Sequence, residues 1–152
     1  MHPEEKIAQL GLSLPPAATP AAAYIPFVQS GNLLFLSGHI PKRNGQVVVG
    51  QLGRTMQTAA AKQVAREVTV DLLGTLKAAV GDLGRIQRIV KVMGLVNSTP
   101  DFTEQHLVIN GCSELLGEVF ADKGVHARSA FGVAQIPLGA CVEIELIAEI
   151  SA

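Results

Sequence analysis

The spacing of apolar residues changes several times along the chain, and each change predicts an element of secondary structure. Residues 25–30 and 33–37 are short apolar runs on either side of Gly31-Asn32, a pair suited to the positive φ angles of a tight turn. They therefore predict a β-hairpin. The β-branched run 47–49 follows a glycine-containing turn and predicts a short edge strand.

Two longer segments have helical spacing. Apolar residues recur every three or four positions between residues 56 and 80, which defines one face of a long helix that Gly81 ends. A second helix is expected to start with Thr99 or Asp101 as its N-cap and to close near residues 122–124. The apolar face of this second helix is formed by Phe102, His106, Ile109, Leu116 and Phe120.

Alternating apolar residues predict three further strands, at residues 85–96, at about 127–135 and at about 141–150. Because helices alternate with these strands, the chain must cross over between neighbouring strands. The sequence therefore predicts an α/β fold of the α+β kind, a two-layer sandwich with a mixed β-sheet and two helices packed on one face.

The beginning of the chain differs in composition from the rest. Residues 3–12 predict a short helix, and the Pro/Ala-rich residues 14–23 are expected to lie extended on the surface. We therefore expect an N-terminal arm, residues 1–23, that adds little to the core, followed by a single domain, residues 24–152.

The chain is expected to be cytoplasmic. Glu4 and Glu5 stand where a secretory signal has net positive charge, and four prolines interrupt any apolar helix before residue 27. Cys112 and Cys141 lack C-x-x-C spacing, which predicts neither a disulfide framework nor a metal-binding knuckle.

Composition limits the partners. The chain has 152 residues, enough for one domain that buries roughly 70% of its unfolded surface. Charged residues make up 16%, below the usual value of about 25%, which indicates that copies of the chain cover part of the exterior. The net charge of −1 and the aromatic content of 4% lack the basic stripe and stacking platform of nucleic-acid-binding proteins. We expect a homo-oligomer that binds neither nucleic acid nor membranes.

Common catalytic motifs are missing. No phosphate-binding loop, dinucleotide-binding motif or H-E-x-x-H zinc motif occurs, so nucleotide transfer and zinc hydrolysis have no support. The four histidines are too scattered for a metal site, and none is predicted. His106 lies on the apolar helix face and is expected to be a core residue. Cys141 shares the strand parity of Glu143 but lacks an activating histidine, so it is assigned to packing.

Arg128 and Glu143 are charged residues within otherwise apolar strands. A guanidinium is permanently charged and matches a carboxylate, so an arginine in a strand either pairs with an acid or binds an acidic ligand. Arg128 and Glu143 could form such an ion pair with each other. The alternation of Glu143 with Glu145 and Glu149 is also typical of a solvated strand face. The residues alone leave these alternatives open.

Several ordered blocks of the sequence resemble the signatures of a known family. The blocks are Gly31-Asn32-Leu33-Leu34-Phe35-Leu36-Ser37-Gly38, Val108-Ile109-Asn110-Gly111, Ala127-Arg128-Ser129, Ala134-Gln135-Ile136-Pro137 and Val142-Glu143-Ile144-Glu145-Leu146-Ile147-Ala148. On these blocks, residues 24–150 resemble the reactive-intermediate deaminases, also called the RidA or YjgF-like family. Residues 1–23 resemble the N-terminal extension of a longer branch.

The resemblance implies a chorismate-mutase-like trimer with three clefts between subunits. In the family, the arginine that matches Arg128 binds the carboxylate of a 2-imino acid or its enamine tautomer. The glutamate that matches Glu143 orients the hydrolytic water. The implied reaction releases ammonia and a 2-keto acid, and it requires no cofactor.

The same match implies that Tyr24 from the neighbouring subunit, together with Ser37, Gly38 and Asn110, lines the cleft. Ala130 stands where the family usually has cysteine, and its backbone carbonyl is expected to hold the water. His39 stands where glutamine is common, and its imidazole is expected to alter the shape and charge of the pocket.

Other functions remain open. A trimeric binding protein could use the same arginine to hold a small carboxylate metabolite as a sensor or regulator, without turnover. Endoribonuclease activity has been attached to family relatives, but the acidic balance gives little attraction for phosphates. A chorismate-mutase-like role would need further cations, which only Arg43 or Arg54 could supply.

Overall fold

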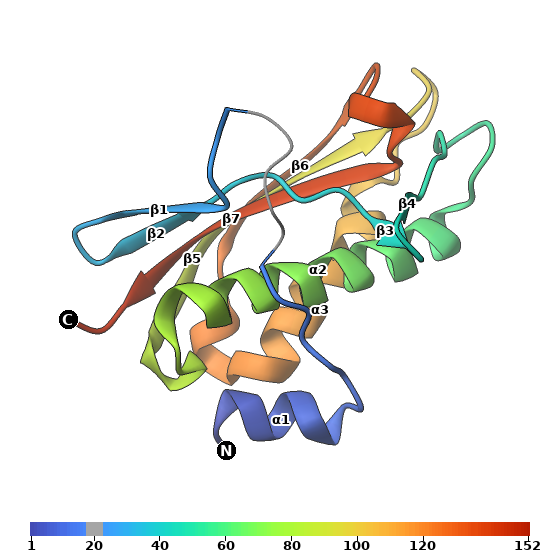
Figure 1. The fold of residues 1–152 in the computed structure, drawn as a ribbon. Coiled ribbons are helices and arrows are strands. Elements are labelled where there is room, and N and C mark those ends of the chain that lie inside the picture. Colours follow the sequence, from blue (N-terminus) through green and yellow to red (C-terminus); the bar gives the residue numbers. More distant parts are fainter. Residues whose placement is uncertain (18–22) are drawn as a thin grey trace.

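The computed structural model describes residues 1–17 and 23–152. Its helices and strands are α1 (Pro3–Gln9), β1 (Phe27–Ser30), β2 (Leu33–Leu36), β3 (Lys42–Arg43), β4 (Gln46–Val47), α2 (Thr58–Val80), β5 (Ile86–Asn97), α3 (Gln105–Phe120), β6 (Ala127–Val133) and β7 (Val142–Ile150). Short 3-10 turns lie at Leu83–Arg85, Ala121–Gly124 and Pro137–Gly139. Figure 1 shows two layers, a sheet and the helices α2 and α3 on one of its faces, with α1 on the far side of the helices. The predicted two-layer sandwich is confirmed.

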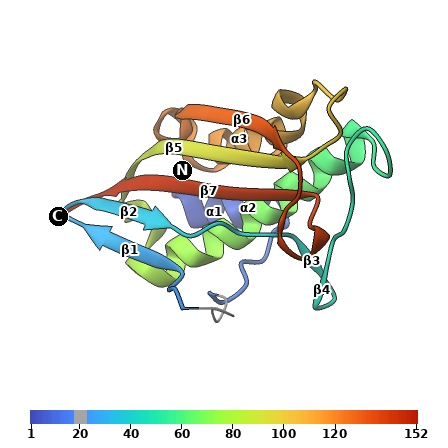
Figure 2. The same ribbon diagram turned by 90° about the horizontal axis from the view of Figure 1, so that it is seen from above.

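Five strands form the main sheet in the order β1-β2-β7-β5-β6. β5 and β6 pair in parallel, and the other three pairs are antiparallel. A parallel pair needs a crossover connection, which α3 supplies between β5 and β6. The sheet is therefore mixed, as predicted, and β1 and β6 are its edges. Figure 2 looks onto the face that α2 and α3 leave uncovered, which we call the open face.

Strand β7 shows how the two faces differ. Its residues alternate between buried apolar side chains, beginning with Val142 and Ile144, and more exposed ones, beginning with Glu143 and Glu145. Successive side chains of a strand point to opposite faces, so the apolar set packs under the helices and the acids lie on the open face. The open face also carries exposed apolar side chains.

The hairpin and the long helix follow the predicted pattern. Ser30 pairs with Leu33 across a turn in which Gly31 takes a φ of 60°. α2 buries the predicted face, and α3 approaches it closely. A methyl group at Gly111 would lie 2.1 Å from the backbone oxygen of Lys62 in α2, so a larger residue would force these helices apart. This close contact completes the core beneath the sheet.

The predicted start of the second helix is wrong. α3 begins at Gln105, and its N-cap residue makes no side-chain capping bond. The backbone N–H of Thr99 donates to the carbonyl of Leu52 at 2.9 Å, and the carbonyl of Thr99 accepts from the backbone N–H of Phe102 at 3.2 Å, so Thr99 begins a turn that precedes the helix. Asp101 and Phe102 precede the helix as well.

The predicted edge strand at residues 47–49 is confirmed only in part. Gln46–Val47 is a strand that pairs with Lys42–Arg43 in a separate two-stranded sheet, and Val49 forms an isolated bridge to Ala140. The turn between the two strands uses positive φ angles at Asn44 and Gly45, 53° and 77°, which folds the chain back on itself.

The N-terminal helix contributes to the core. Ile7 of α1 is 4% exposed and belongs to the main hydrophobic cluster. The carboxylate of Glu4 pairs with Lys77 and accepts a hydrogen bond from the backbone of Leu83 at 3.2 Å. The expectation that the first residues add little to the core is therefore wrong for α1. The boundary between residues 1–23 and 24–152 stays a prediction, and residues 18–22 lie outside the described residues.

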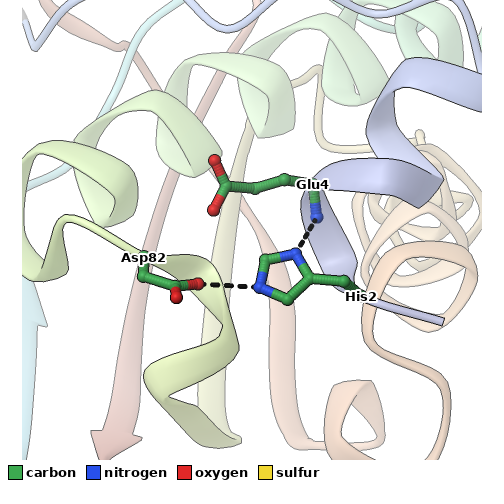
Figure 3. Close-up of side chains that lie close together, drawn as sticks. All are labelled: His2, Glu4 and Asp82. Atoms are coloured by element: carbon green, nitrogen blue, oxygen red, sulfur yellow. Dashed lines mark hydrogen bonds and ion pairs between the residues drawn. The ribbon is translucent and has the colours of Figure 1, made fainter.

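His2 anchors the start of α1, as Figure 3 shows. Its Nδ1 accepts a hydrogen bond from the backbone N–H of Glu4 at 3.2 Å, and its Nε2 lies 2.7 Å from Asp82 Oδ1. Since Nδ1 is the acceptor, Nε2 carries the proton and donates to Asp82. His2, Glu4 and Asp82 each offer an atom to one small cluster, but Glu4 already pairs with Lys77. The cluster fastens α1 to the domain.

Neither α2 nor any other helix in the described part of the chain combines the length and the apolar composition that a transmembrane segment needs.

Replacing Ile7 with alanine should lower the free energy of unfolding by about 2 kcal/mol or more, because it leaves a cavity in the core. Urea denaturation monitored by circular dichroism measures this change. Ile25→Ala is the matched control, since Ile25 is 58% exposed and should lose much less stability. Equal effects for the two variants would show that α1 does not belong to the cooperative core.

Candidate functional site

Arg128 extends from the edge strand β6 to α3. Its Nη1 donates to Asn110 Oδ1 at 2.8 Å and to Ser113 Oγ at 3.2 Å, and its Nη2 donates to the carbonyl oxygen of His106 at 3.4 Å. Residues 106, 110 and 113 are spaced by one helical turn each, so they share one face of α3. The helix therefore presents three oxygens to a single guanidinium.

All three partners of Arg128 are uncharged. No carboxylate among the described residues lies within ion-pair distance of Arg128, so the considered ion pair with Glu143 is not formed. A guanidinium has five N–H groups, and the three bonds to α3 leave two, including the one on Nε, without a partner in the described part of the chain. A half-buried cation held in this way is suited to bind a carboxylate.

Glu143 lies on the open face, directly over the backbone of Gly38. A methyl group at Gly38 would lie 2.4 Å from Glu143 Oε2, so the carboxylate occupies the space that any side chain there would need. The neighbouring Ser37 donates its hydroxyl proton to the carbonyl oxygen of Ile25 at 2.6 Å. This bond holds the segment that begins with Tyr24, whose side chain is 52% exposed, next to Ser37 and Gly38.

The surroundings of Glu143 favour its protonated form. Burial raises the pKa of Glu143 above its ordinary value, and the negative charge of Glu145 raises it further. A carboxylate with a raised pKa is a better proton acceptor near neutral pH than an ordinary one, which is the property that a general base needs.

The predicted site residues form two separate groups in one copy of the chain. Leu95 of β5 pairs with Glu143 on one side and with Phe131 of β6 on the other. Two strand spacings, about 10 Å, therefore separate β7 from β6. Arg128 is three residues from Phe131, so its side chain points to the opposite face from Glu143. We call Arg128 and Asn110 the arginine group.

The second set is the glutamate group, which consists of Tyr24, Ser37, Gly38 and Glu143. One copy of the chain brings together the members of each group but does not bring the two groups together. Ala130 lies two residues beyond Arg128 on the same side of β6, where it is half-buried and packs against the core.

His39 does not point toward Glu143. Its Nδ1 lies 2.7 Å from the carbonyl oxygen of Ser37, and its Nε2 lies 2.9 Å from Thr75 Oγ1 in α2. Burial lowers the pKa of His39, although the bond to Ser37 opposes this shift. The effect of the imidazole on the shape and charge of the pocket stays a prediction. The ring supports Ser37 from the helix side.

Two further expectations have opposite outcomes. The side chain of His106 is exposed, so its prediction as a core residue is wrong. The reason is that α3 starts at Gln105, which puts His106 in the first turn, before the buried stripe begins at Val108. Cys141 is fully buried, and burial raises the pKa of its thiol to about 11, which confirms its assignment to packing.

Sequence reasoning missed Ser113 and His126. Ser113 Oγ lies 2.9 Å from His126 Nε2 and also binds Arg128. Two spacings in the sequence point to these residues. Ser113 follows Asn110 by three residues on the helix, and His126 precedes Arg128 by two residues, which places both on the side of the guanidinium.

Comparisons with known proteins show what the chain is similar to. The family described as "YjgF/chorismate_mutase-like, putative endoribonuclease" matches residues 4–150. The protein TCP17 of Trypanosoma cruzi is 43% identical over 145 residues, which cover 94% of this chain and 91% of that protein.

Solved structures are similar in fold. The crystal structure of an Agrobacterium tumefaciens protein of unknown function has 45% identity and a TM-score of 0.90, and the match covers 98% of this chain and 92% of that one. The structure of a Shewanella oneidensis protein named as an endoribonuclease has 30% identity and a TM-score of 0.94, with 99% and 100% of the chains covered. These similarities span both groups of the site.

Replacing Glu143 with glutamine should stabilise the protein at pH 7. Since the folded-state pKa of Glu143 is raised, the folded chain binds this proton more tightly than the unfolded chain, whose pKa is about 4.5. The contribution of this bound proton to the stability of the folded state is fully present below pH 4.5 and is lost as pH rises through the folded-state pKa of Glu143. The gain from glutamine should therefore be largest at neutral pH and vanish below pH 4.5.

Thermal unfolding of parent and variant between pH 4 and pH 8 measures this difference. Glu149→Gln is the matched control, because Glu149 is exposed on the same strand and face. It should change stability little. A Glu143→Gln variant that is less stable than the parent at every pH would contradict the assigned role of burial.

Proposed function

The chain belongs to the YjgF/chorismate-mutase-like family, and from this premise we propose that it hydrolyses reactive 2-imino or enamino acids to 2-keto acids and ammonia. The reaction takes place in a cleft between subunits. Arg128 binds the substrate carboxylate, and Glu143 orients and activates the water. No cofactor takes part in these steps.

The observation that carries the proposal is the environment of Arg128. Three neutral oxygens orient its guanidinium, yet none of them balances its charge. Leaving a half-buried cation unbalanced costs free energy, which an incoming carboxylate recovers through charge-assisted hydrogen bonds. Asn110 supports this role, since it accepts from Nη1 and leaves Nε free for the ligand.

Glu143 supplies the acid–base chemistry. An enamino acid first tautomerises to its imine. Water then adds across the C=N bond: the oxygen joins the carbon, and the proton passes through the Glu143 carboxylate to the nitrogen. In the second step the hydroxyl proton of this intermediate passes to the nitrogen by the same route, the C–N bond breaks, and ammonia leaves the 2-keto acid. The raised pKa of Glu143 suits both transfers.

Assembly of the site requires a second copy of the chain. The arginine group and the glutamate group lie on opposite faces of one sheet, so a single substrate can meet both only where two copies adjoin. Val28, Phe35 and Phe131 are 51%, 41% and 44% exposed on the open face, which favours its burial against other copies. In the trimer that we propose, each cleft takes Tyr24 and the rest of the glutamate group from one subunit and the arginine group from the next.

Ala130 and Ser37 have supporting roles in this cleft. We assign the backbone carbonyl of Ala130, rather than its side chain, to the water. Ser37 is engaged by its bond to Ile25 and keeps the chain at Gly38 close to Glu143. Because glycine has no side chain, the ligand contacts the backbone directly at Gly38.

Cleavage of RNA has weaker support, although the family description and the name of the Shewanella protein both contain the word endoribonuclease. Binding an RNA backbone requires several cations along a surface. The open face instead carries Glu143, Glu145 and Glu149. A small substrate with one carboxylate fits this arrangement better.

A second candidate is a trimeric protein that binds a small carboxylate as a regulator without turnover. The observation in its favour is that the arginine group is held by α3 alone and needs no contribution from Glu143. Ammonia release from 2-aminoacrylate and longer enamino acids, generated in situ, separates the candidates, because only the hydrolase accelerates it.

Arg128→Lys and Glu143→Gln should have different effects. Lysine keeps the charge but loses the planar fork, so binding of a 2-keto acid should weaken by about 1.5–3 kcal/mol. Glutamine is nearly isosteric with glutamate, so binding should persist while turnover falls by about 100-fold or more. Calorimetric titration reports binding, and ammonia release reports turnover.

Arg66→Lys is the control for Arg128→Lys. Arg66 forms a bidentate pair with Glu118 on the helix layer, away from the arginine group and the glutamate group. It should behave like the parent. If Arg128→Lys also binds and turns over like the parent, the carboxylate is bound elsewhere.

The protein should have the mass of three 15.9 kDa chains in solution at micromolar concentration, because the open face is covered by other copies. Phe35→Glu places a charge on that face and should dissociate the trimer and abolish turnover. Ala78→Glu places the same charge on the exposed side of α2 and should leave the trimer intact. Light scattering measures the mass, and a parent protein that is monomeric would refute the intersubunit cleft.

A further inference from the structure

A row of hydrogen bonds lies behind Arg128. His126 Nδ1 is 2.6 Å from the carbonyl oxygen of Gly124, His126 Nε2 is 2.9 Å from Ser113 Oγ, and Ser113 Oγ is 3.2 Å from Arg128 Nη1. A carbonyl oxygen only accepts, so the ring proton must be on Nδ1, and the neutral ring accepts at Nε2. Ser113 therefore donates its proton to His126 and accepts from Arg128.

We propose that His126 is a positioning residue, which acts through Ser113 to hold the Arg128 guanidinium in the orientation that binds a carboxylate. The inference rests on the proposed function for the identity of the ligand. The hydrogen-bond row itself does not depend on that function.

Ser113 is an anchor of Arg128 whose hydroxyl can turn away. The carbonyl oxygen of His106 is fixed by the helix backbone, and Asn110 Oδ1 can only accept, whereas the Ser113 hydroxyl can also donate. A serine hydroxyl in a helix can rotate and donate to a carbonyl of the preceding turn. By accepting this proton, His126 keeps a lone pair of Ser113 directed at Nη1.

The arrangement requires a neutral histidine. Burial lowers the pKa of His126; the bond to Gly124 opposes this shift, and the charge of Arg128 adds to it. Arg128 of β6, two residues beyond His126, is the charged group that acts on the ring. α3 contributes the Ser113 hydroxyl and the buried Cys112 thiol, and the turn Ala121–Gly124 carries the exposed Asp122 and Lys123.

Protonation of His126 would convert Nε2 into a donor, and Ser113 could no longer donate to it. Arg128 would then keep its bonds to Asn110 and the His106 carbonyl but lose the fixed lone pair of Ser113. Carboxylate binding should therefore weaken as pH falls through the folded-state pKa of His126, which burial places below the ordinary value of 6.5. A histidine that acted only through its charge would have the opposite effect, because a second cation attracts the anion. The sign of the pH dependence therefore distinguishes positioning from simple charge.

The test uses 2-oxobutyrate as the probe, titrated by calorimetry at pH 7.5 and pH 5.5. All titrations use the Glu143→Gln protein as the background. This variant lacks the Glu143 carboxyl, whose own protonation would otherwise contribute to the measured pH dependence. In this background we expect binding to weaken several-fold at pH 5.5. His126→Gln keeps a neutral acceptor for Ser113, so it should bind like the background at pH 7.5 and lose the weakening at pH 5.5.

His126→Leu and Ser113→Ala remove the two ends of the same hydrogen bond. Each should weaken binding about 3-fold to 10-fold at both pH values, and the double variant should be no weaker than either single variant, because the row acts as a unit. With Glu143 present, each should raise KM and leave kcat nearly unchanged. His2→Gln, far from the site, is the control and should not alter binding.

Nitrogen NMR of the histidines tests the row without any ligand. The Nδ1–H tautomer of His126 at pH 7.5, and faster rotation of the Arg128 guanidinium in Ser113→Ala, are the expected results. If the parent binds no 2-keto acid but both NMR results are observed, the proposed function is wrong and the hydrogen-bond row from His126 to Arg128 is supported. An Nε2–H tautomer, additive effects in the double variant, or tighter binding at pH 5.5 would each overturn the positioning role.

Discussion

The parallel pairing of β5 with β6 is the constraint on which the site depends. Parallel neighbours cannot be joined by a tight turn, so the chain must cross over, and α3 is that crossover. The crossover lays α3 along the edge strand that carries Arg128. Because of this placement, one face of the helix meets the guanidinium with Asn110, Ser113 and the backbone carbonyl of His106 in its first turn. The topology of the sheet thus creates the arginine group before any ligand is present.

The antiparallel part of the sheet creates the glutamate group in a different way. β7 lies between β2 and β5, and the continuation of β2 bridges to Ile144 through His39, which brings Gly38 under Glu143. Strand alternation then directs Glu143 away from the helices. The same alternation that buries a core on one face therefore separates the two groups by a sheet. The proposed activity therefore requires self-association, because it uses both groups on one substrate, and this requirement links it to the exposed apolar residues of the open face.

Local patterns predicted the features that depend on neighbouring residues. The hairpin at Gly31, the buried face of α2 and the strands that carry Arg128 and Glu143 follow from turn chemistry and periodicity. The errors arose where distant contacts decide. Thr99 bonds to the backbone of Leu52 and begins a turn before α3, and Thr75 bonds the ring of His39 on the helix side. The sequence also contains no local signal that Ile7 joins the core. Arg128 and Asn110 were predicted together through a family resemblance, whereas Ser113 and His126 needed the packing of α3 on β6 to become visible.

His39 and His126 share one geometry, although they lie on different elements and support different groups. Each has its Nδ1 against the carbonyl two residues earlier and its Nε2 against a hydroxyl of a helix, Thr75 or Ser113. Burial lowers the pKa of both rings, so the unfolded chain takes up protons below pH 6.5 more readily than the folded one. Stability from these rings is full above pH 6.5 and falls as acid protonates them. The raised pKa of Glu143 has the opposite sign, because its protonation favours the folded state. The charge state that suits the proposed catalysis, with both rings neutral and the carboxylate ionised, is therefore favoured as pH rises, and along that direction the histidines stabilise the fold while Glu143 lowers its stability.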